Sequence, residues 1–144
     1  MAKYVPDQST KRWVVIAPSR VERPDTVNKK PIIENSLSIT NPCPFCEGNE
    51  NLTPPEVWRV GGEGNWNKLG WKVRVVPNKY TITDIHEVII HSPDPTKDIE
   101  DLPLSQVELI LKVYRQRYQI HKNNGQFLIF CNHGPRAGAS LTHP

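Results

Sequence analysis

Two apolar runs in the stretch KVRVVPNKYTITDIHEVIIH, residues 72–91, decide the fold. The first run, residues 72–76, is rich in valine, and a similar run at residues 57–60 precedes it across the glycine-rich segment GGEGNWNKLG. β-Branched residues bounded by turn residues are typical of strands, so these two runs predict a hairpin with a long loop. The second run, residues 86–91, is too short for a helix and is followed by Ser92-Pro93, which favours a third, buried strand.

Two further apolar runs lie outside this region, at residues 12–17 and 126–131. Both are predicted to be strands, because β-branched and aromatic residues dominate them. The first leads into a loop that contains Arg20 and Arg23, and the second leads into a glycine-containing loop, residues 132–140.

One helix is expected between the last two predicted strands. Ser105 and Glu108 have the spacing of a capping box, and the turn signal at residues 123–125 ends the pattern. The residues predicted to share one apolar face are Val107, Ile110, Leu111, Tyr114 and Tyr118. Strands that outnumber helices predict an α+β domain with a mostly antiparallel sheet and one main packed helix.

Length and charge limit the classes of function. The 144 residues suffice for a single domain spanning residues 1–144, and the net charge is only +3. Acidic and basic residues are mixed along the chain, which argues for a local phosphate site and against a nucleic-acid-binding stripe. No run approaches the roughly 18 apolar residues of a membrane span, and the N-terminus lacks the apolar run of a signal peptide. We therefore expect a cytoplasmic protein without a membrane partner.

The spacing of Cys43 and Cys46 places two thiolates on one tight turn, which suits a tetrahedral metal ion such as zinc. A thioredoxin-like redox pair and a reduced structural pair are the alternatives. Because a zinc site needs about four ligands and no second such motif follows, histidines would have to complete it. The candidates are His86, His91, His121, His133 and His143.

The loop from Asn132 to Ser140 combines an amide, glycines and a hydroxyl directly after an apolar run, so its backbone could approach a phosphate closely. Taken alone, such a loop is more often an ordinary turn. Arg20 and Arg23 could supply bidentate donors to a diphosphate, although loop arginines are commonly just solvated.

Five segments taken in order resemble the galactose-1-phosphate uridylyltransferase family, a branch of the histidine-triad superfamily. The match extends over most of the chain, and each segment alone is a weak signal. The segments are WVVIAPSR (13–20) with Arg23-Pro24, CPFC (43–46) with GNE (48–50), VRVVPNKY (73–80), HEVII (86–90), and FCNHG (130–134) with AGASLTHP (137–144).

The resemblance implies a histidine-triad-like fold and a ping-pong transfer of a uridylyl group from UDP-glucose to galactose 1-phosphate through a covalent nucleotidyl-histidine. The family's nucleophile is the second histidine of a His-Pro-His motif, and His143-Pro144 supplies the first two members. The chain is therefore expected to be the N-terminal part of such an enzyme, truncated within the motif, with no catalytic residue of its own and no activity alone. The full enzyme is expected to be a homodimer.

Site residues carried over from the family fall into three sets. Cys43, Cys46 and His143 would bind a structural zinc, and Asn132, Gly138 and Ser140 would position phosphates. Arg20, Arg23 and Asn78 would belong to the nucleotide-sugar pocket.

The departure from the family pattern is Pro95, which stands where the family often has the remaining zinc ligand, a histidine. Proline offers no donor atom. His91 or another molecule would then have to supply the fourth ligand, or the metal would be weakly bound or absent. A surface or strand-end role is the alternative for His91.

Two other functions remain open on these residues. One is a non-catalytic zinc- or nucleotide-binding module, and the other is a relative that uses another nucleotide sugar, such as an ADP-glucose phosphorylase. A nucleic-acid-binding zinc knuckle is less consistent with the sequence, because there is one cysteine pair and no basic, aromatic-rich face.

Overall fold

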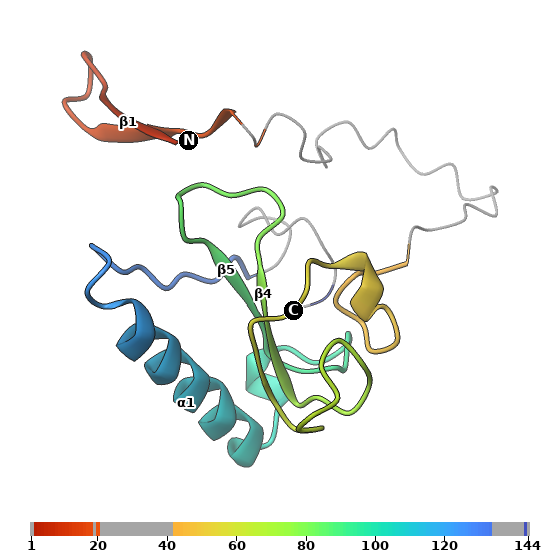
Figure 1. Cartoon of the computed structure of the whole chain (residues 1–144). Helices are drawn as coiled ribbons and strands as arrows, with labels where there is room; N and C mark the ends of the chain where they lie inside the picture. The colour runs from red at the N-terminus through yellow and green to blue at the C-terminus, as the bar shows by residue number, and fades with distance from the viewer. Residues whose placement is uncertain (1, 19, 21–41, 134–142, 144) are drawn as a thin grey trace, which may run out of the picture.

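The computed structural model describes residues 2–18, 20, 42–133 and 143 (Figure 1). The elements within these residues form an α+β arrangement with antiparallel sheets and one main helix, as predicted. In chain order they are β1 (Lys3–Pro6), β2 (Trp13–Ile16), the 3-10 helix η3 (Glu50–Leu52), β3 (Trp58–Val60), β4 (Val73–Pro77), β5 (Glu87–Ile90), the 3-10 helix η4 (Ile99–Asp101) and α1 (Leu104–His121).

The main sheet has the order β3-β4-β5, and both pairings are antiparallel. Val60 pairs with Val73 at the hairpin end, and Arg74 pairs with Ile90 on the other edge of β4. The predicted hairpin and the predicted third strand are therefore confirmed. The long loop needs glycine at Gly61, where φ is +86° and an added Cβ would lie 2.9 Å from the carbonyl oxygen of Gly70.

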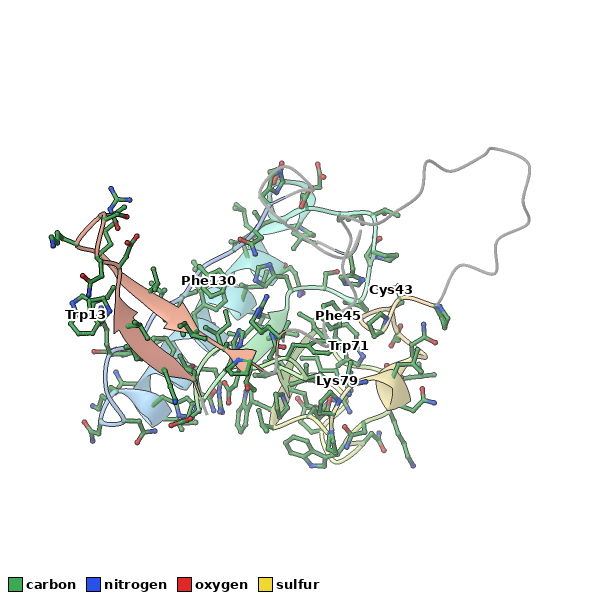
Figure 2. The ribbon with its side chains drawn as sticks, turned by 90° about the horizontal axis from the view of Figure 1, so that it is seen from above. Trp13, Cys43, Phe45, Trp71, Lys79 and Phe130 are labelled. Atoms are coloured by element: carbon green, nitrogen blue, oxygen red, sulfur yellow. The ribbon has the colours of Figure 1, made fainter. Side chains whose placement is uncertain are left out.

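Strand β4 is buried on both faces because a different layer covers each. Val73 and Val75 pack with Ile110 and Val113 of α1, which lies along one side of the sheet (Figure 1). Val76, on the opposite face, packs with Trp71 and Ile90, and Phe45 lies against that cluster. The second cluster joins the segment that carries the cysteines to the sheet, as the labelled Cys43, Phe45 and Trp71 show in Figure 2.

The start of α1 differs from the prediction. The helix begins at Leu104, with Pro103 as its N-cap residue and without a side-chain cap hydrogen bond. Ser105 thus lies inside the first turn, where it cannot cap, and Glu108 pairs instead with Lys112 at 2.7 Å. The capping box was wrong because Pro103, whose carbonyl accepts the first helical N–H groups, already ends the preceding extended segment.

The buried face of α1 is in part the predicted one, because Ile110 is buried and Val107 and Tyr114 pack against the core. Ile110, Val113 and Arg117 are buried, whereas Leu111 and Tyr118 are 56% and 45% exposed. Arg117 can be buried because its guanidinium Nε lies 2.8 Å from the carboxylate of Glu87 on β5. An apolar pattern cannot reveal an inward-facing arginine whose partner lies 30 residues away.

The strand predicted at residues 126–131 is wrong. These residues have no ladder pairing, and Leu128 and Phe130 are 76% and 55% exposed. Phe127 is the exception, since its ring contacts those of Tyr118 and His121 on α1. An apolar run forms a strand only when a neighbour offers backbone partners, and none of the described strands pairs with this one.

The strand predicted at residues 12–17 is confirmed as β2, and its partner β1 was not predicted. Lys3 pairs with Ile16 and Pro6 with Trp13 in a separate two-stranded sheet. Every residue of β2 is exposed, including Trp13 at 68%, and Figure 2 shows Trp13 far from the labelled Cys43.

Among the described residues, no helix combines the length and apolar character needed to cross a bilayer.

Candidate metal centre and the adjoining nucleotide loop

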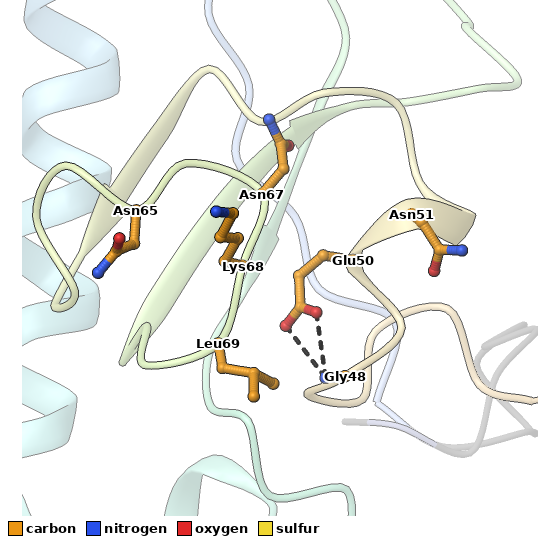
Figure 3. A pocket seen from close by; sticks show the side chains of 7 residues that line it. All are labelled: Gly48, Glu50, Asn51, Asn65, Asn67, Lys68 and Leu69. Atoms are coloured by element: carbon orange, nitrogen blue, oxygen red, sulfur yellow. Dashed lines mark hydrogen bonds between the residues drawn. The ribbon is translucent and has the colours of Figure 1, made fainter.

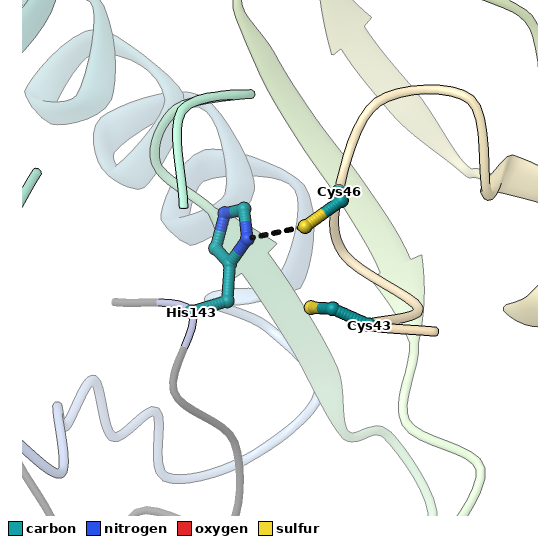
Figure 4. Close-up of side chains that lie close together, drawn as sticks. All are labelled: Cys43, Cys46 and His143. Carbon is teal, nitrogen blue, oxygen red and sulfur yellow. Dashed lines mark hydrogen bonds between the residues drawn. The ribbon is translucent and has the colours of Figure 1, made fainter. Parts of the chain in front are cut away.

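The cysteine knuckle, residues 43–46, is a tight turn in which the N–H of Cys46 donates to the carbonyl of Cys43 at 3.3 Å. The turn brings both sulfur atoms to one side, facing the imidazole of His143 (Figure 4). His143 Nδ1 lies 3.7 Å from Cys46 Sγ, and the three ligand atoms of Cys43, Cys46 and His143 all lie within 4.8 Å of one another. The structure therefore brings together the three residues predicted as metal ligands.

The orientation of His143 suits metal binding. Its Nε2 lies 2.9 Å from the carbonyl oxygen of Ser92, which can only accept, so the ring proton is on Nε2. The lone pair of Nδ1 then faces the sulfur atoms, as in histidine ligands whose other nitrogen donates to a backbone carbonyl. Burial lowers the pKa of His143, although the Ser92 carbonyl and Asp94 oppose the shift, and the neutral ring that a metal requires is favoured.

Two sulfurs and one imidazole nitrogen form a donor set that zinc accepts. Without a cation, burial and the neighbouring Cys43 raise the pKa of Cys46, so its thiol keeps its proton. A divalent ion would reverse this shift by stabilising the thiolate. The residues present thus fit zinc in charge and donor type.

Among the described residues, the candidate metal-binding group at the knuckle consists of Cys43, Cys46 and His143. Pro95 offers no donor, and the carboxylate of the preceding Asp94 accepts hydrogen bonds from Thr96 and pairs with Lys97 at 3.2 Å. These contacts lower the pKa of Asp94 to about 2 and keep it charged in a local turn.

His91 does not join the cysteines in the structure. Its Nε2 lies 2.6 Å from the hydroxyl of Tyr114 on α1, and the two rings pack at a tilt of 57°. His121 contacts Glu87 at 3.3 Å, and His133 contacts Asp98 at the same distance. These three histidines therefore have partners other than the cysteines, and His91 directly follows β5, in agreement with the strand-end role considered for it.

The segment after the knuckle holds it in place. The side chain of Asn49 donates to the carbonyl of Cys43 at 2.8 Å, and the carboxylate of Glu50 accepts from the N–H of Gly48 at 3.1 Å. Trp71 completes the arrangement by donating its indole N–H to Glu50 at 2.8 Å. Burial raises the pKa of Glu50, but the hydrogen bonds from Trp71 and Gly48 and the charge of Arg74 outweigh it, and the net pKa is lowered.

A buried ionic cluster lies beneath this segment. Arg74 Nε lies 2.6 Å from Glu56, and the same guanidinium donates to the carbonyl of Glu50. Arg59 lies 3.4 Å from Glu56, and its guanidinium also donates to the carbonyl of Lys68 in the long loop. Sequence reasoning missed this cluster, although the arginines inside two valine-containing strands were the available signal.

The loop after β4 carries Asn78, and Arg20 contacts this loop at Tyr80. Arg20 Nη1 donates to the carbonyl of Tyr80 at 3.1 Å, while the side-chain oxygen of Asn78 accepts from the N–H of Tyr80 at 2.8 Å. The N–H of Asn78 donates in turn to the carbonyl of His86. We refer to residues 78–86 with Arg20 as the nucleotide loop, a name that reflects only the prediction for Arg20 and Asn78, which both contact Tyr80 there.

His86, one of the histidines considered as a metal ligand, lies in the nucleotide loop and is not part of the cysteine group. Burial and the nearby positive charge of Arg20 lower its pKa, so the ring is neutral near pH 7. Asn132 lies on the exposed end of the 126–131 segment, after Phe130, whose ring lies 6.5 Å from that of His86. The remaining predicted residues, Arg23, Gly138 and Ser140, lie outside the described residues.

An open depression of about 590 Å³ lies between the segment after the knuckle and the long loop of the hairpin (Figure 3). It shares no residue with the predicted ligand sets. Its lining residues are Gly48, Glu50, Asn51, Asn65, Asn67, Lys68 and Leu69. The depression therefore does not contain the candidate metal ligands.

Comparison with known proteins finds relatives of one kind. The chain is 32% identical to ADP-glucose phosphorylase of Arabidopsis thaliana over 95% of its length, and 26% identical to galactose-1-phosphate uridylyltransferase of Thermotoga maritima over 94%. It spans 45% and 42% of those relatives, which is less than half of each. No protein-family model matches the chain.

Solved structures agree with the sequence relatives. An ADP-glucose phosphorylase from Arabidopsis thaliana with bound ADP-glucose matches 99% of the chain, with 29% identity and a TM-score of 0.55. A GalT-like protein from the same plant matches 70%, with 30% identity and a TM-score of 0.57. The chain covers 46% and 37% of these structures.

Fold and structural neighbours together define a histidine-triad-like α+β protein. Within that class, its sequence relatives and structural neighbours are members of the galactose-1-phosphate uridylyltransferase family, the family that its segment order resembles.

Proposed function

We propose that the chain is the N-terminal part of a nucleotidyltransferase that moves a uridylyl group between UDP-glucose and a hexose 1-phosphate. The observation that carries the proposal is the convergence of Cys43, Cys46 and His143 in the structure, because these residues come from segments 97 positions apart in sequence. A chance cysteine turn would not be expected to meet a buried, correctly oriented imidazole. The family relationship supplies the reaction class.

Zinc would have a structural role in this protein. Held by Cys43, Cys46 and His143, it would tie the knuckle to the segment that carries His143 and the phosphate-binding residues predicted before it. The tie would fix the position of His143 against the sheet, because Ser92, next to β5, holds the other side of the imidazole.

The residues of this chain would bind and orient the nucleotide. Arg20 and Asn78 would contact the nucleotide sugar from the nucleotide loop, with Arg23 as a further pocket residue. Asn132, Gly138 and Ser140 would position the phosphates. The position that matches the family's nucleophile follows Pro144, and its imidazole would attack the α-phosphorus and expel the sugar phosphate.

A second candidate substrate is ADP-glucose. Identity is higher to the ADP-glucose phosphorylase than to the uridylyltransferase, at 32% against 26%, over a similar share of the chain. UDP-glucose and ADP-glucose differ in the base, so binding measurements can distinguish the two candidates.

The test is isothermal titration of UDP-glucose and of ADP-glucose into the purified chain, with zinc content measured on the same sample. Binding of either nucleotide sugar in the micromolar to millimolar range, weakened at least about tenfold by Arg20→Ala or Asn132→Ala, is the expected result. Arg115→Ala is the matched control, since Arg115 is an exposed arginine on α1. Bound zinc without nucleotide binding would indicate instead a non-catalytic zinc-binding module.

We further propose that the complete protein is a cytoplasmic homodimer, as the family resemblance implies. Sedimentation velocity on the complete protein tests the dimer, and a monomer at micromolar concentration would exclude it.

A further inference from the structure

The hydrogen bonds of the nucleotide loop fix which way the amide of Asn78 points. Its side-chain oxygen lies 2.8 Å from the N–H of Tyr80, and a backbone N–H can only donate. The amide nitrogen Nδ2, which carries two hydrogens and no available lone pair, must therefore be the atom that faces His86. The distance from Asn78 Nδ2 to His86 Nε2 is 3.4 Å.

The tautomer of His86 is fixed by a second backbone group. His86 Nδ1 lies 3.1 Å from the backbone nitrogen of Ile82, whose hydrogen it must accept. Nδ1 then has no proton, and the proton of the neutral ring is on Nε2. The nearby charge of Arg20 and partial burial favour this neutral ring over the imidazolium.

Two donors consequently face each other. Neither Asn78 Nδ2 nor His86 Nε2 can accept the other's hydrogen, and half-buried donors without an acceptor reduce stability. Rotating either group would not help, because each would lose its backbone partner, Tyr80 or Ile82. Within the part of the chain that the structure describes, neither hydrogen is donated to an oxygen, and a single oxygen placed between the two nitrogen atoms could accept both.

We propose that Asn78 and His86 form a two-donor subsite for a single acceptor oxygen of a bound nucleotide. The inference deepens the proposed function and rests on it for the identity of the ligand, whereas the donor geometry stands without it. The acceptor is either an anionic phosphate oxygen or a neutral oxygen of the nucleoside. The exposed ring of Phe130, 6.5 Å from the imidazole, adds an apolar side to the subsite.

Two substitutions of His86 distinguish the loss of a donor to the ligand from the loss of the hydrogen bond to Ile82. His86→Asn can keep an acceptor for Ile82 but loses the donor at the Nε2 position, and His86→Gln can place an amide donor there but loses the acceptor. We expect His86→Asn to weaken the binding of UDP-glucose or ADP-glucose about tenfold and His86→Gln to weaken it less than about threefold. Equal losses in both variants, or no loss in His86→Asn, would overturn the subsite.

Asn78→Asp gives an independent check. Its carboxylate would accept the Nε2 hydrogen of His86 and so take the place of the ligand's oxygen. We expect its affinity for UDP-glucose or ADP-glucose to be lower than that of His86→Asn. Unfolding midpoints of all variants show whether each remains folded. Binding at the wild-type level in Asn78→Asp would contradict the proposal.

Titrations with uridine, UMP and inorganic phosphate distinguish the two sources of the oxygen. A His86→Asn penalty with uridine places the acceptor on the nucleoside, and a penalty only with UMP and phosphate places it on a phosphate.

Nitrogen NMR of the imidazole separates this subsite from the proposed function. We expect the Nε2–H tautomer in the free chain and a shift of Nε2 when a ligand is added. If no nucleotide sugar binds but phosphate shifts Nε2, the proposed function fails and the subsite stands. If nucleotide sugars bind while Nε2 is unmoved, the subsite fails and the function stands, and the absence of both responses overturns both.

Discussion

The imidazole of His143 donates its Nε2 hydrogen to the carbonyl oxygen of Ser92 over 2.9 Å, so its other nitrogen faces the sulfur of Cys46. A ligand set oriented before the metal arrives loses less conformational freedom when the metal binds. The predictions below begin with this centre and continue to the contacts that support it.

We expect the chain to bind one zinc ion and Cys46→Ser to weaken that binding at least about tenfold, because a hydroxyl replaces a thiolate ligand. Competition with a chromophoric chelator measures the affinity. Cys131→Ser is the matched control, since Cys131 is the exposed free cysteine. Equal zinc affinity in the two variants would contradict the ligand assignment.

Glu56→Gln should destabilise the fold by about 3–5 kcal/mol, because it leaves the buried guanidinium of Arg74 without its charged partner. Urea unfolding measures the change. Glu108→Gln serves as the control, since the pair of Glu108 with Lys112 is exposed and its loss should leave the unfolding midpoint unchanged. Similar midpoints for both variants would show that the buried cluster contributes little.

Trp71→Phe should lower the free energy of unfolding by about 1–3 kcal/mol, since the buried carboxylate of Glu50 would lose its indole donor. The same substitution at Trp13, which is 68% exposed, should change it by less than about 0.5 kcal/mol. Thermal or urea unfolding of the two variants makes the comparison. A larger loss at Trp13 would mean that the β1–β2 hairpin is covered in solution.

The pKa of His86 should lie below the ordinary value of about 6.5, because burial and Arg20 disfavour the charged ring. Between the lowered folded value and about 6.5, the unfolded chain binds a proton that the folded chain does not, so stability falls as the pH decreases. NMR titration of His86 measures the midpoint, and urea unfolding at pH 7.5 and 5.5 measures the loss. A midpoint at or above about 6.5, or stability that rises at pH 5.5, would be the contrary result.

The main sheet could be predicted from sequence because β4 and its neighbours are short valine-rich runs bounded by turn residues. The same reasoning failed at residues 126–131, where composition favours a strand but no described strand supplies backbone partners. It also missed β1, since the KYVP segment is too short and too polar to signal a strand without its pairing to β2. Pairing between segments is a tertiary property that local composition does not contain.

The candidate site also has a part that the sequence predicted and a part that it did not. The spacing of the two cysteines predicted a metal pair, and family resemblance added His143. The roles of Asn49 and Glu50 were not predicted, because their hydrogen bonds depend on how the knuckle turns back on itself and on Trp71, 21 positions away from Glu50. Contacts of this kind follow from the folded path of the chain.

The contact between Cys46 and His143 spans 97 positions, which has a consequence during protein synthesis. The knuckle leaves the ribosome well before its imidazole partner, and at about 5–20 residues per second the delay is roughly 5–20 s. Throughout that interval a captured cation would have only two sulfur ligands from the chain and could exchange with other thiols. Closure of the centre therefore has to wait until residue 143 has left the ribosome, so capture of a cation by the knuckle and completion of the ligand set are separate events.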